Sequence, residues 1–494
     1  MQLTCVRFRA LVYCDPTYRT QHQMSPGQKS QRSFDRTIVE GALPGAVWKI
    51  AWPTMLQNVV GGMQGIVDQA MVGNYVGHTG NAAIGVSLQI FILVIVFVAS
   101  VFTGMGILVA RFAGANDPEK VNRTVYQAFL TAVFMAVGVL APIGYFAAPT
   151  LLSMVNAAPE VQVEALPYIR INFVFSIGML IFFMMSGALR SAGDARTPLR
   201  LGVMMTVLNV VLNIILIRGL GPIPSFGTTG AAMGTAIASG VTGLVFVALL
   251  FSGRLVIRFS RAMSFRPDWA IIRELFRFGL PTGFQGIVMN LAGVFLLRFV
   301  GSLEHSAEAQ AVYAVGYAEL FSLITWTSVG LMGATAAVAG QNLGAGKPDR
   351  SARAATVASG MGLVVAAIVG LSFVLIPRQL LGVFALSEGV SYELGSQLLR
   401  YLAVSGFFVT IALTYTGGLQ GTGDTRSPLY ISIVSQVLVP IGLCTYFSYT
   451  RGLVAGDIWL AIVLGHMTRA FLSMARFRQG KWRQISVNIG EASA

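Results

Sequence analysis

Long apolar runs follow one another along nearly the whole chain of 494 residues. Each run approaches or exceeds the roughly 20 residues that a helix needs to cross the hydrocarbon of a bilayer. Short polar segments separate them, so the pattern predicts an all-α membrane protein with twelve transmembrane helices. The runs lie at about 49–74, 80–109, 124–148, 166–188, 199–219, 229–252, 276–302, 308–340, 352–377, 397–418, 428–449 and 456–475.

Two pairs of motifs recur at a constant spacing of 230 residues. LRSAGDARTPL at Leu189–Leu199 returns as LQGTGDTRSPL at Leu419–Leu429 (419 − 189), and GANDP at Gly114–Pro118 returns as GAGKP at Gly344–Pro348. Such a long period indicates a duplicated domain rather than a solenoid. In each motif, Asp194 or Asp424 is expected to cap the next helix, whose first turn holds Pro198 or Pro428.

Each copy holds six predicted helices, an even number, so both copies enter the membrane in the same orientation. The sequence therefore predicts two parallel six-helix repeats around a central cleft, an arrangement typical of transporters that alternate between two open states. The expected divisions are a disordered cytoplasmic tail at 1–44, an N-lobe at 45–255, a cytoplasmic linker at 256–275, a C-lobe at 276–476 and a cytoplasmic tail at 477–494.

Charge is scarce and unevenly placed. Charged residues make up 11% of the chain, against about 25% in soluble domains, and the mean hydropathy is +0.70. The connections at 74–80, 149–165 and 303–307 contain no Lys or Arg, whereas the alternate ones are basic. The positive-inside rule then places both termini in the cytoplasm of a multi-pass protein of the plasma (inner) membrane. The net charge of +14 is spread over these connections, which argues against nucleic-acid binding.

Several other classes lack their usual residues. The four histidines, His22, His78, His305 and His466, are scattered, so an enzyme is not expected, and no phosphate-binding Gly-rich loop followed by Lys-Ser/Thr is present. Cys5, Cys14 and Cys444 suggest no disulfide framework. Met24 is a second candidate for the start of translation.

One carboxylate lies inside the predicted membrane region of the first half. Asp68 falls in the outer part of the first helix, Asn209 and Asn213 share one face of the fifth, and Thr235 lies one to two turns into the sixth. All four reach a similar depth, which suggests a cage for a hard cation, or a proton site. The alternative is that Asn side chains simply hydrogen-bond Asp68 and hold the helices together.

The second half offers Glu319, an acid within the eighth predicted helix. The repeat spacing pairs it with Gln89, so both side chains are candidates to face a shared cavity. Pairing with Arg298 is the alternative role for Glu319. His466 is expected to be a hydrogen-bonded structural residue, and Met184 is a candidate for a soft, adaptable cavity lining.

With these residues in place, the chain resembles the multidrug and toxic compound extrusion (MATE) transporters. The matching pieces are Pro53 with VDQAMVG, SGALRSAGDARTPL, LNVVLNIILI and FGTTGAAMGTAIA, then GLPTGFQ, AVAGQNLGAGKPDRSAR and GGLQGTGDTRSPL. The resemblance implies antiport, in which amphipathic organic cations or drugs leave as Na⁺ or H⁺ enters. A monomer suffices for this fold, so we expect a monomer in contact with membrane lipid, with no cofactor other than bound Na⁺. A flippase for lipid-linked or other amphiphilic precursors, from the same superfamily, is the alternative.

The resemblance also assigns roles to residues. The family's cation site maps onto Asp68, Asn209, Asn213 and Thr235, but members usually carry Asp at the last position of the Asn-x-x-x-Asp pattern, where this chain has Asn213. Because that carboxylate is absent, the resemblance does not decide whether the coupling ion is Na⁺ or H⁺. Some members carry a Glu in the seventh helix and an Asp in the tenth. Here the tenth has no acid, and Gln285 and Asn290 lie in the seventh, where both are candidates to line the substrate cavity.

Overall fold

The fold is taken from a computed structural model, which describes residues 34–155, 158–260 and 266–487. The described residues belong to one compact unit. Cys5, Cys14, His22 and Met24 lie outside the described residues. The described part is helical, with a single isolated β-bridge between Leu220 and Ile223.

The first half of the described chain contributes six membrane-spanning segments. Three of these segments are single helices, and each of the other three consists of two helices. In two of the three, the helices are separated by a short break; in the third, they are connected by π-helical turns at 135–140 and 143–147. In order they are α2 (Leu43–Tyr75), α3 (His78–Ala99) with α4 (Val101–Gly114), α5 (Pro118–Phe134) with α6 (Ala148–Met154), α7 (Pro159–Val174) with α8 (Ile177–Ser191), α9 (Arg196–Arg218) and α10 (Gly227–Ser252).

The second half repeats this order. Its segments are α11 (Trp269–Val300), α12 (Ser306–Tyr313) with α13 (Ser322–Gly344), α14 (Pro348–Leu375) followed by α15 (Pro377–Gly382), α16 (Gly389–Gly421), α17 (Arg426–Ser432) with α18 (Val439–Thr450), and α19 (Ala455–Arg478). Ten of the described segments are long and apolar enough to cross a membrane alone, and α7 with α8, bent by 51°, makes an eleventh. The twelfth is α2, whose 33 residues include Gln64 and Asp68. The predicted twelve-helix fold is confirmed.

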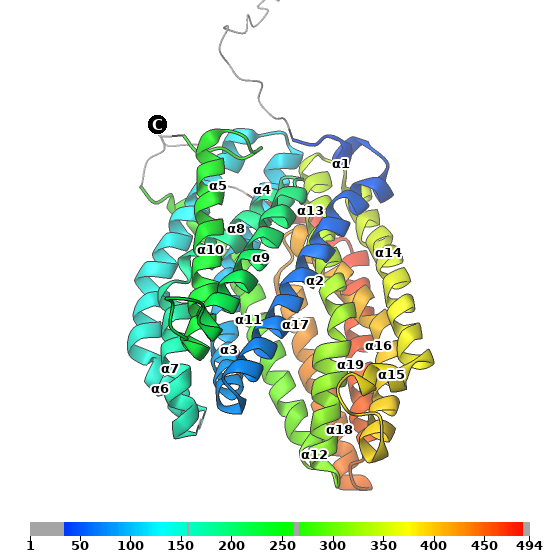
Figure 1. The fold of residues 1–494 in the computed structure, drawn as a ribbon. Coiled ribbons are helices and arrows are strands. Elements are labelled where there is room, and N and C mark those ends of the chain that lie inside the picture. Colours follow the sequence, from blue (N-terminus) through cyan, green and yellow to red (C-terminus); the bar gives the residue numbers. More distant parts are fainter. Residues whose placement is uncertain (1–33, 156–157, 261–265, 488–494) are drawn as a thin grey trace, which may run out of the picture. The chain divides into compact units, whose positions relative to one another are not determined.

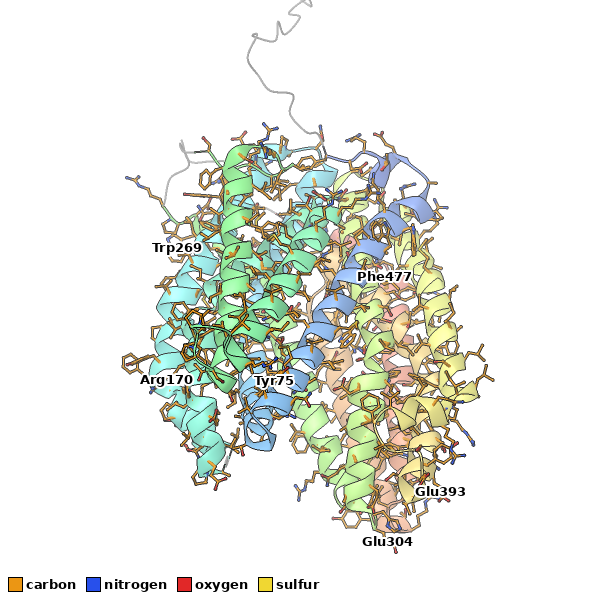
Figure 2. The ribbon with its side chains drawn as sticks, viewed as in Figure 1. Tyr75, Arg170, Trp269, Glu304, Glu393 and Phe477 are labelled. Carbon is orange, nitrogen blue, oxygen red and sulfur yellow. The ribbon has the colours of Figure 1, made fainter. Side chains whose placement is uncertain are left out.

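The two ends of this unit are distinct in Figure 1. The short helix α1 (Thr37–Glu40) lies at one end, which we call the α1 end, and α6, α12 and α15 lie at the other, which we call the α12 end. Glu304 and Glu393 mark the α12 end in Figure 2. Because Ile38 of α1 is fully buried and α2 begins at Leu43, the tail predicted to be disordered through residue 44 is ordered from α1 onward.

The repeated motifs fold in the same way in both halves. Asp194 accepts hydrogen bonds from the backbone N–H and hydroxyl of Thr197 (3.0 and 2.6 Å), and Asp424 does so from Ser427 (3.1 and 2.8 Å). The glycine before each Asp takes a positive φ, 100° at 193 and 96° at 423, which a residue with a Cβ rarely adopts. The predicted helix caps are therefore confirmed at both sites.

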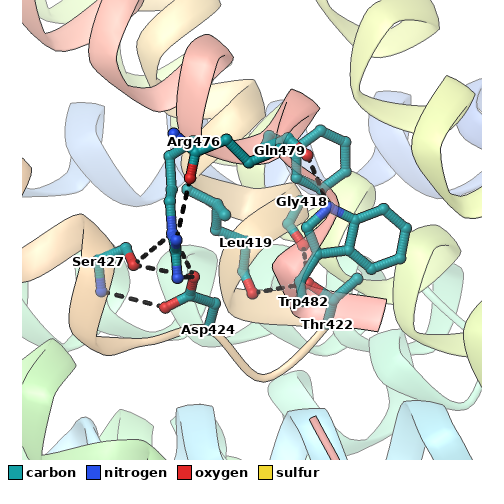
Figure 3. A network of polar contacts seen from close by, with 9 residues as sticks. Gly418, Leu419, Thr422, Asp424, Ser427, Arg476, Gln479 and Trp482 are labelled. Atoms are coloured by element: carbon teal, nitrogen blue, oxygen red, sulfur yellow. Dashed lines mark hydrogen bonds and ion pairs between the residues drawn. The ribbon is translucent and has the colours of Figure 1, made fainter. Parts of the chain in front are cut away.

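The second copy of the motif carries an additional ion pair. Figure 3 shows Arg476 of α19 reaching Asp424 (2.9 Å) while also donating to the Ser427 hydroxyl (2.8 Å). The residue 230 positions earlier is Phe246, which is buried in the apolar core of the first half. The repeat thus preserves the turn but not the partner that neutralises its carboxylate.

The two largest apolar cores lie mainly in one half each, and glycines bring the halves together. The larger cores surround Phe173 and Phe246 in the first half and Phe321 and Trp459 in the second. Between the halves, α2 packs on α13 and α4 packs on α11. A Cβ built on Gly330 would meet the Met55 backbone at 2.7 Å, and one on Gly279 the Ser100 carbonyl oxygen at 2.7 Å. Small residues permit this backbone approach, as in other membrane helix pairs.

Candidate functional site

The structure brings the predicted cation residues together in the first half. Asp68 lies on α2, Asn209 and Asn213 on α9, and Thr235 on α10, and these helices pack against one another. The Asn213 side-chain N–H donates to Asp68 Oδ1 at 2.7 Å. Asn209 and Asn213 are fully buried, while Asp68 and Thr235 are half-buried. We call these four residues the Asp68 cluster.

The amide of Asn209 completes the cluster. Oriented so that both of its ends find partners, its oxygen accepts from Thr235 Oγ1 (3.1 Å) and its nitrogen donates to Asp68 Oδ1 (2.9 Å). Both amides then point N–H groups at one carboxylate oxygen. Hydrogen bonds to an ionised carboxylate are stronger than neutral ones, so this arrangement suits the charged form of Asp68.

One oxygen of the cluster lacks a donor. The side-chain oxygen of Asn213 is buried and has no hydrogen-bond partner in the described structure. It lies against Gly234 of α10, where a Cβ would approach within 2.1 Å. A buried acceptor without a donor is costly, and hard cations take oxygen ligands. The cluster thus holds a carboxylate and an unpaired amide oxygen, which are ligands that such a cation takes, and the carboxylate can alternatively take a proton.

No cation among the described residues forms an ion pair with Asp68. In the same part of the chain, no group of three His, Cys, Asp or Glu side chains could hold a metal. The second half does not repeat the cluster, since the repeat spacing replaces Asn209 and Asn213 with Val439 and Leu443. The cluster therefore belongs to the first half alone.

A cavity of about 370 Å³ lies between the two halves. Its lining comes from α3, α4 and α8 on one side and from α11, α13 and α16 on the other. Most lining side chains are apolar; the polar ones are Ser100, Thr103, Arg190, Ser191, Thr282 and Gln420. Toward the α1 end the helices touch, since a Cβ on Gly340 would lie 2.7 Å from the Ala110 Cβ and 2.8 Å from the Gly421 carbonyl oxygen. We call this space the central cavity.

The residues predicted to line a cavity do not line this one. Met184 is fully buried in the core of the first half, and its neighbour Phe183 lines the cavity instead. Gln285 is buried in the second half, where it donates to the Ser432 hydroxyl (2.9 Å) and accepts from Gln420 (3.2 Å). Asn290 is exposed and donates to the Gly286 carbonyl of its own helix (2.9 Å).

Glu319 and Gln89 also lie away from the central cavity. Glu319 is half-buried in the π-helical turn Ala314–Leu320, and Gln89 is exposed on α3. The described structure contains no ion pair between Glu319 and Arg298, so that alternative is not supported either. His466 is buried, hydrogen-bonded to the Ser405 hydroxyl and stacked on Phe321.

Sequence reasoning missed the polar residues of the central cavity. Arg190 and Gln420 both line it, and they are repeat equivalents within the duplicated motifs. The sequence does contain a signal for them: the repeated motifs LRSAGD and LQGTGD differ in charge at their second position, which is Arg190 in the first and Gln420 in the second. The motif was interpreted as a turn, and only the packing places its last helical residues beside the cavity.

Comparison with known proteins identifies a family whose model matches both halves of the chain. The family model described as MatE matches residues 53–215 and 281–445. A probable multidrug resistance protein NorM of Thermotoga maritima is 25% identical over 89% of this chain and 93% of its own length. The multidrug resistance protein MdtK of Pectobacterium atrosepticum is also 25% identical, over 87% and 94%.

Solved structures agree on the fold. An outward-facing conformation of a multidrug resistance MATE family transporter of the MOP superfamily has a TM-score of 0.84 at 22% identity, covering 92% of this chain and 98% of that one. A MATE protein in complex with MaL6 has a TM-score of 0.83 at 22% identity, covering 90% and 97%. The family model spans well over half of the chain and matches both repeats, so this protein belongs to the MATE family of multidrug efflux transporters.

Proposed function

We propose that this protein is a secondary antiporter in which Na⁺ or H⁺ acts at the Asp68 cluster and drives export of an amphipathic organic molecule through the central cavity. The observation that carries the proposal is the Asp68 carboxylate, without an ion pair among the described residues, beside the oxygen of Asn213 that has no donor there. A transmembrane acid facing a bundle interior is expensive to maintain and marks an ion or proton pathway.

Coupling requires that the ion favour one conformation over the other. Asp68 and Asn213 lie on α2 and α9, and α2 also packs against α13 of the opposite half. An ion bound by Asp68 removes the charge that holds the amides of Asn209 and Asn213. The packing between α2 and α9 then changes, and α2 transmits the change to the other half. This gives the ion a different affinity for the two conformations, as coupling demands.

The orientation follows from charge. We propose that the α1 end faces the cytoplasm of the plasma (inner) membrane, because the basic connections of the sequence lie there. On this orientation the central cavity is closed toward the cytoplasm and the Asp68 cluster lies deeper toward the outside. A monomer contains both halves and hence the whole cavity, so no partner chain is required.

The substrate class has two candidates from the family resemblance. Amphipathic organic cations are the expected substrates of a multidrug transporter, and lipid-linked or other amphiphilic precursors are those of the flippase alternative. A cavity of about 370 Å³ is within the range that holds drug-sized ligands. Its size alone therefore favours a small molecule over a large lipid-linked one.

The proposal is tested by transport in proteoliposomes with Na⁺ and pH gradients imposed separately. A fluorescent amphipathic dye should accumulate against its gradient when one of the two ion gradients is present, and collapse of that gradient should release it. Dye movement that needs neither gradient would contradict antiport. Movement of a lipid-linked oligosaccharide, with no dye transport, would favour the flippase.

A further inference from the structure

Among the described residues that line the central cavity, a single side chain is charged, and it is basic. Arg190 stands near the end of α8 among lining residues that include no Asp, Glu or Lys. Among the described residues it forms no ion pair. A guanidinium has five N–H donors and stays charged under all physiological conditions. In a mostly apolar space, these donors are stabilised when a ligand supplies a hydrogen-bond acceptor.

The packing holds the guanidinium against the second half. A Cβ built on Gly333 of α13 would lie 2.6 Å from Arg190 Nη1, so the glycine makes room for the head group. The repeat equivalent of Gly333 is Thr103, which has a side chain and also lines the cavity. The cavity thus has a basic wall where Arg190 lies over Gly333, while the equivalent position to Arg190 holds the neutral Gln420.

One further lining residue has an unpaired polar group. The hydroxyl oxygen of Thr282, a lining residue of α11, has no hydrogen-bond partner in the described structure. A hydroxyl can donate as well as accept, so Thr282 is a second group of this lining whose hydrogen-bonding capacity is unused. Bound carboxylates and phosphates are recognised by such charge-assisted hydrogen bonds, and Arg binds them in a bidentate manner.

We propose that the central cavity binds amphipathic molecules through an anionic group, a carboxylate, phosphate or sulfonate, held by Arg190. This inference rests on the proposed transport function and names its substrate class. A permanently cationic substrate in the same cavity would meet an unscreened like charge in an environment of low dielectric, where repulsion is strong. Apolar lining residues such as Ile95, Phe183 and Val329 would contact the rest of the molecule.

The test is equilibrium binding to the purified full-length protein, without any ion gradient. Two xanthene dyes of similar shape serve as probes, fluorescein as the anion and rhodamine 123 as the cation, with fluorescence anisotropy as the readout. The native protein should bind fluorescein more tightly than rhodamine 123. Equal binding, or tighter binding of the cation, would overturn the proposal.

Variants locate the interaction. Arg190→Gln, which introduces the side chain found at the equivalent position 420, should weaken fluorescein binding at least about tenfold while leaving rhodamine 123 binding unchanged or stronger. Arg190→Lys should fall between. Arg200→Gln serves as the matched control, because Arg200 is exposed on α9 and does not line the cavity. Equal weakening of both dyes by Arg190→Gln would mean that Arg190 only supports the end of α8.

A milder variant covers the case in which Arg190→Gln fails to fold. Gly333→Ala adds one methyl group beneath the guanidinium and should weaken fluorescein binding selectively by displacing it. Unchanged fluorescein binding in a folded Gly333→Ala protein would contradict the assigned position of the anion.

Two further experiments distinguish a free small-molecule ligand from a lipid headgroup, and the anion site from the proposed transport function. Added phosphatidylglycerol should leave fluorescein binding intact if the ligand is a free small molecule, whereas competition would identify a lipid headgroup as the anionic ligand. Asp68→Asn should keep fluorescein binding while losing gradient-driven transport. A protein that binds the anion but shows no coupled transport would refute the proposed function and leave the cavity assignment standing.

Discussion

Gly114 of α4 and Gly344 of α13 lie against each other's helices in a reciprocal contact. A Cβ on Gly114 would be 2.0 Å from the Gln341 carbonyl oxygen, and a Cβ on Gly344 would be 2.0 Å from that of Arg111. Each pair of positions differs by 230 residues, so the pseudo-two-fold axis of the repeat passes between these two helix ends. The contact closes the central cavity toward the α1 end.

Enlarging either glycine should weaken this closure. Gly344→Ala forces the backbones apart, and overpacking of this kind costs about 1–3 kcal/mol. The ratio of closed to open molecules should therefore fall by about one to two orders of magnitude. Spin labels on cysteines replacing Glu119 and Asp349, both exposed and also repeat equivalents, should report longer distances in double electron–electron resonance.

A matched control is available in the same half. Gly360 of α14 has no atom within 4 Å of a built Cβ, so Gly360→Ala should leave the distance distribution unchanged. An unchanged distribution in Gly344→Ala as well would show that the reciprocal contact does not hold the α1 end closed.

The position of Asn213 predicts how the driving ion could be changed. Asn213→Asp restores a second carboxylate beside Asp68, and its attraction for a bound cation is large in a site of low effective dielectric. The half-saturating Na⁺ concentration for transport should fall by about tenfold or more, with proton-driven transport reduced. The measurement is initial dye uptake over a series of Na⁺ concentrations at fixed pH. An unaltered Na⁺ response would remove position 213 from the ion site.

The ion pair of Figure 3 should stabilise the second half. Asp424 is buried at 6% side-chain exposure, and Arg476 is its ionic partner. Arg476→Met keeps much of the apolar stem but leaves a buried carboxylate unpaired, which we expect to lower the free energy of unfolding by about 1–3 kcal/mol. Thermal unfolding in detergent measures the loss. Arg478→Met, also in the last turn of α19, is the control; an equal effect there would contradict a specific role for the pair.

The pair at the start of α2 should give a pH-dependent contribution. Burial raises the pKa of the Asp35 carboxyl, but hydrogen bonds from Lys49 and Thr37 and the charge of Lys49 lower the pKa by more, so it lies below its ordinary value of 3.8. A depressed pKa stabilises the fold above about pH 4, and that stability is lost as the pH falls through the folded-state pKa.

Asp35→Asn should therefore lower stability near pH 7 by about 1 kcal/mol or less, since the pair is partly exposed. The difference between Asp35→Asn and the native protein should shrink as the pH falls below about 4 and toward the folded-state pKa of Asp35. Melting curves over a series of pH values from 7 downward measure it. A difference that does not change with pH would show that the charge of Asp35 is not the cause.

The sequence predicted the twelve helices, the duplication and the Asp68 cluster because each leaves a periodic or positional signal. Apolar runs have a fixed length in a bilayer, and the depth of Asp68, Asn209 and Asn213 follows from counting along helices whose ends are marked. The helix caps at Asp194 and Asp424 follow from local chemistry alone.

The lining of the cavity could not be predicted in the same way. Whether Met184 or Phe183 faces the space between the halves depends on the rotation of α8, and both are apolar residues one position apart. Gln285 is satisfied by Ser432 and Gln420, contacts between helices far apart in sequence. Arg190 was visible in the motif, but its exposure to the cavity depends on the packing of α8 against α13.

The central claim, that Asp68 is where the driving ion acts, is tested most directly by Asp68→Asn in proteoliposomes. Dye accumulation under the effective ion gradient should fall to the level seen without a gradient, because an amide cannot carry a proton and binds a cation far more weakly. Glu319→Gln, an acid of the other half, should retain the response to the gradient. Native accumulation by Asp68→Asn under the same gradient would contradict the account.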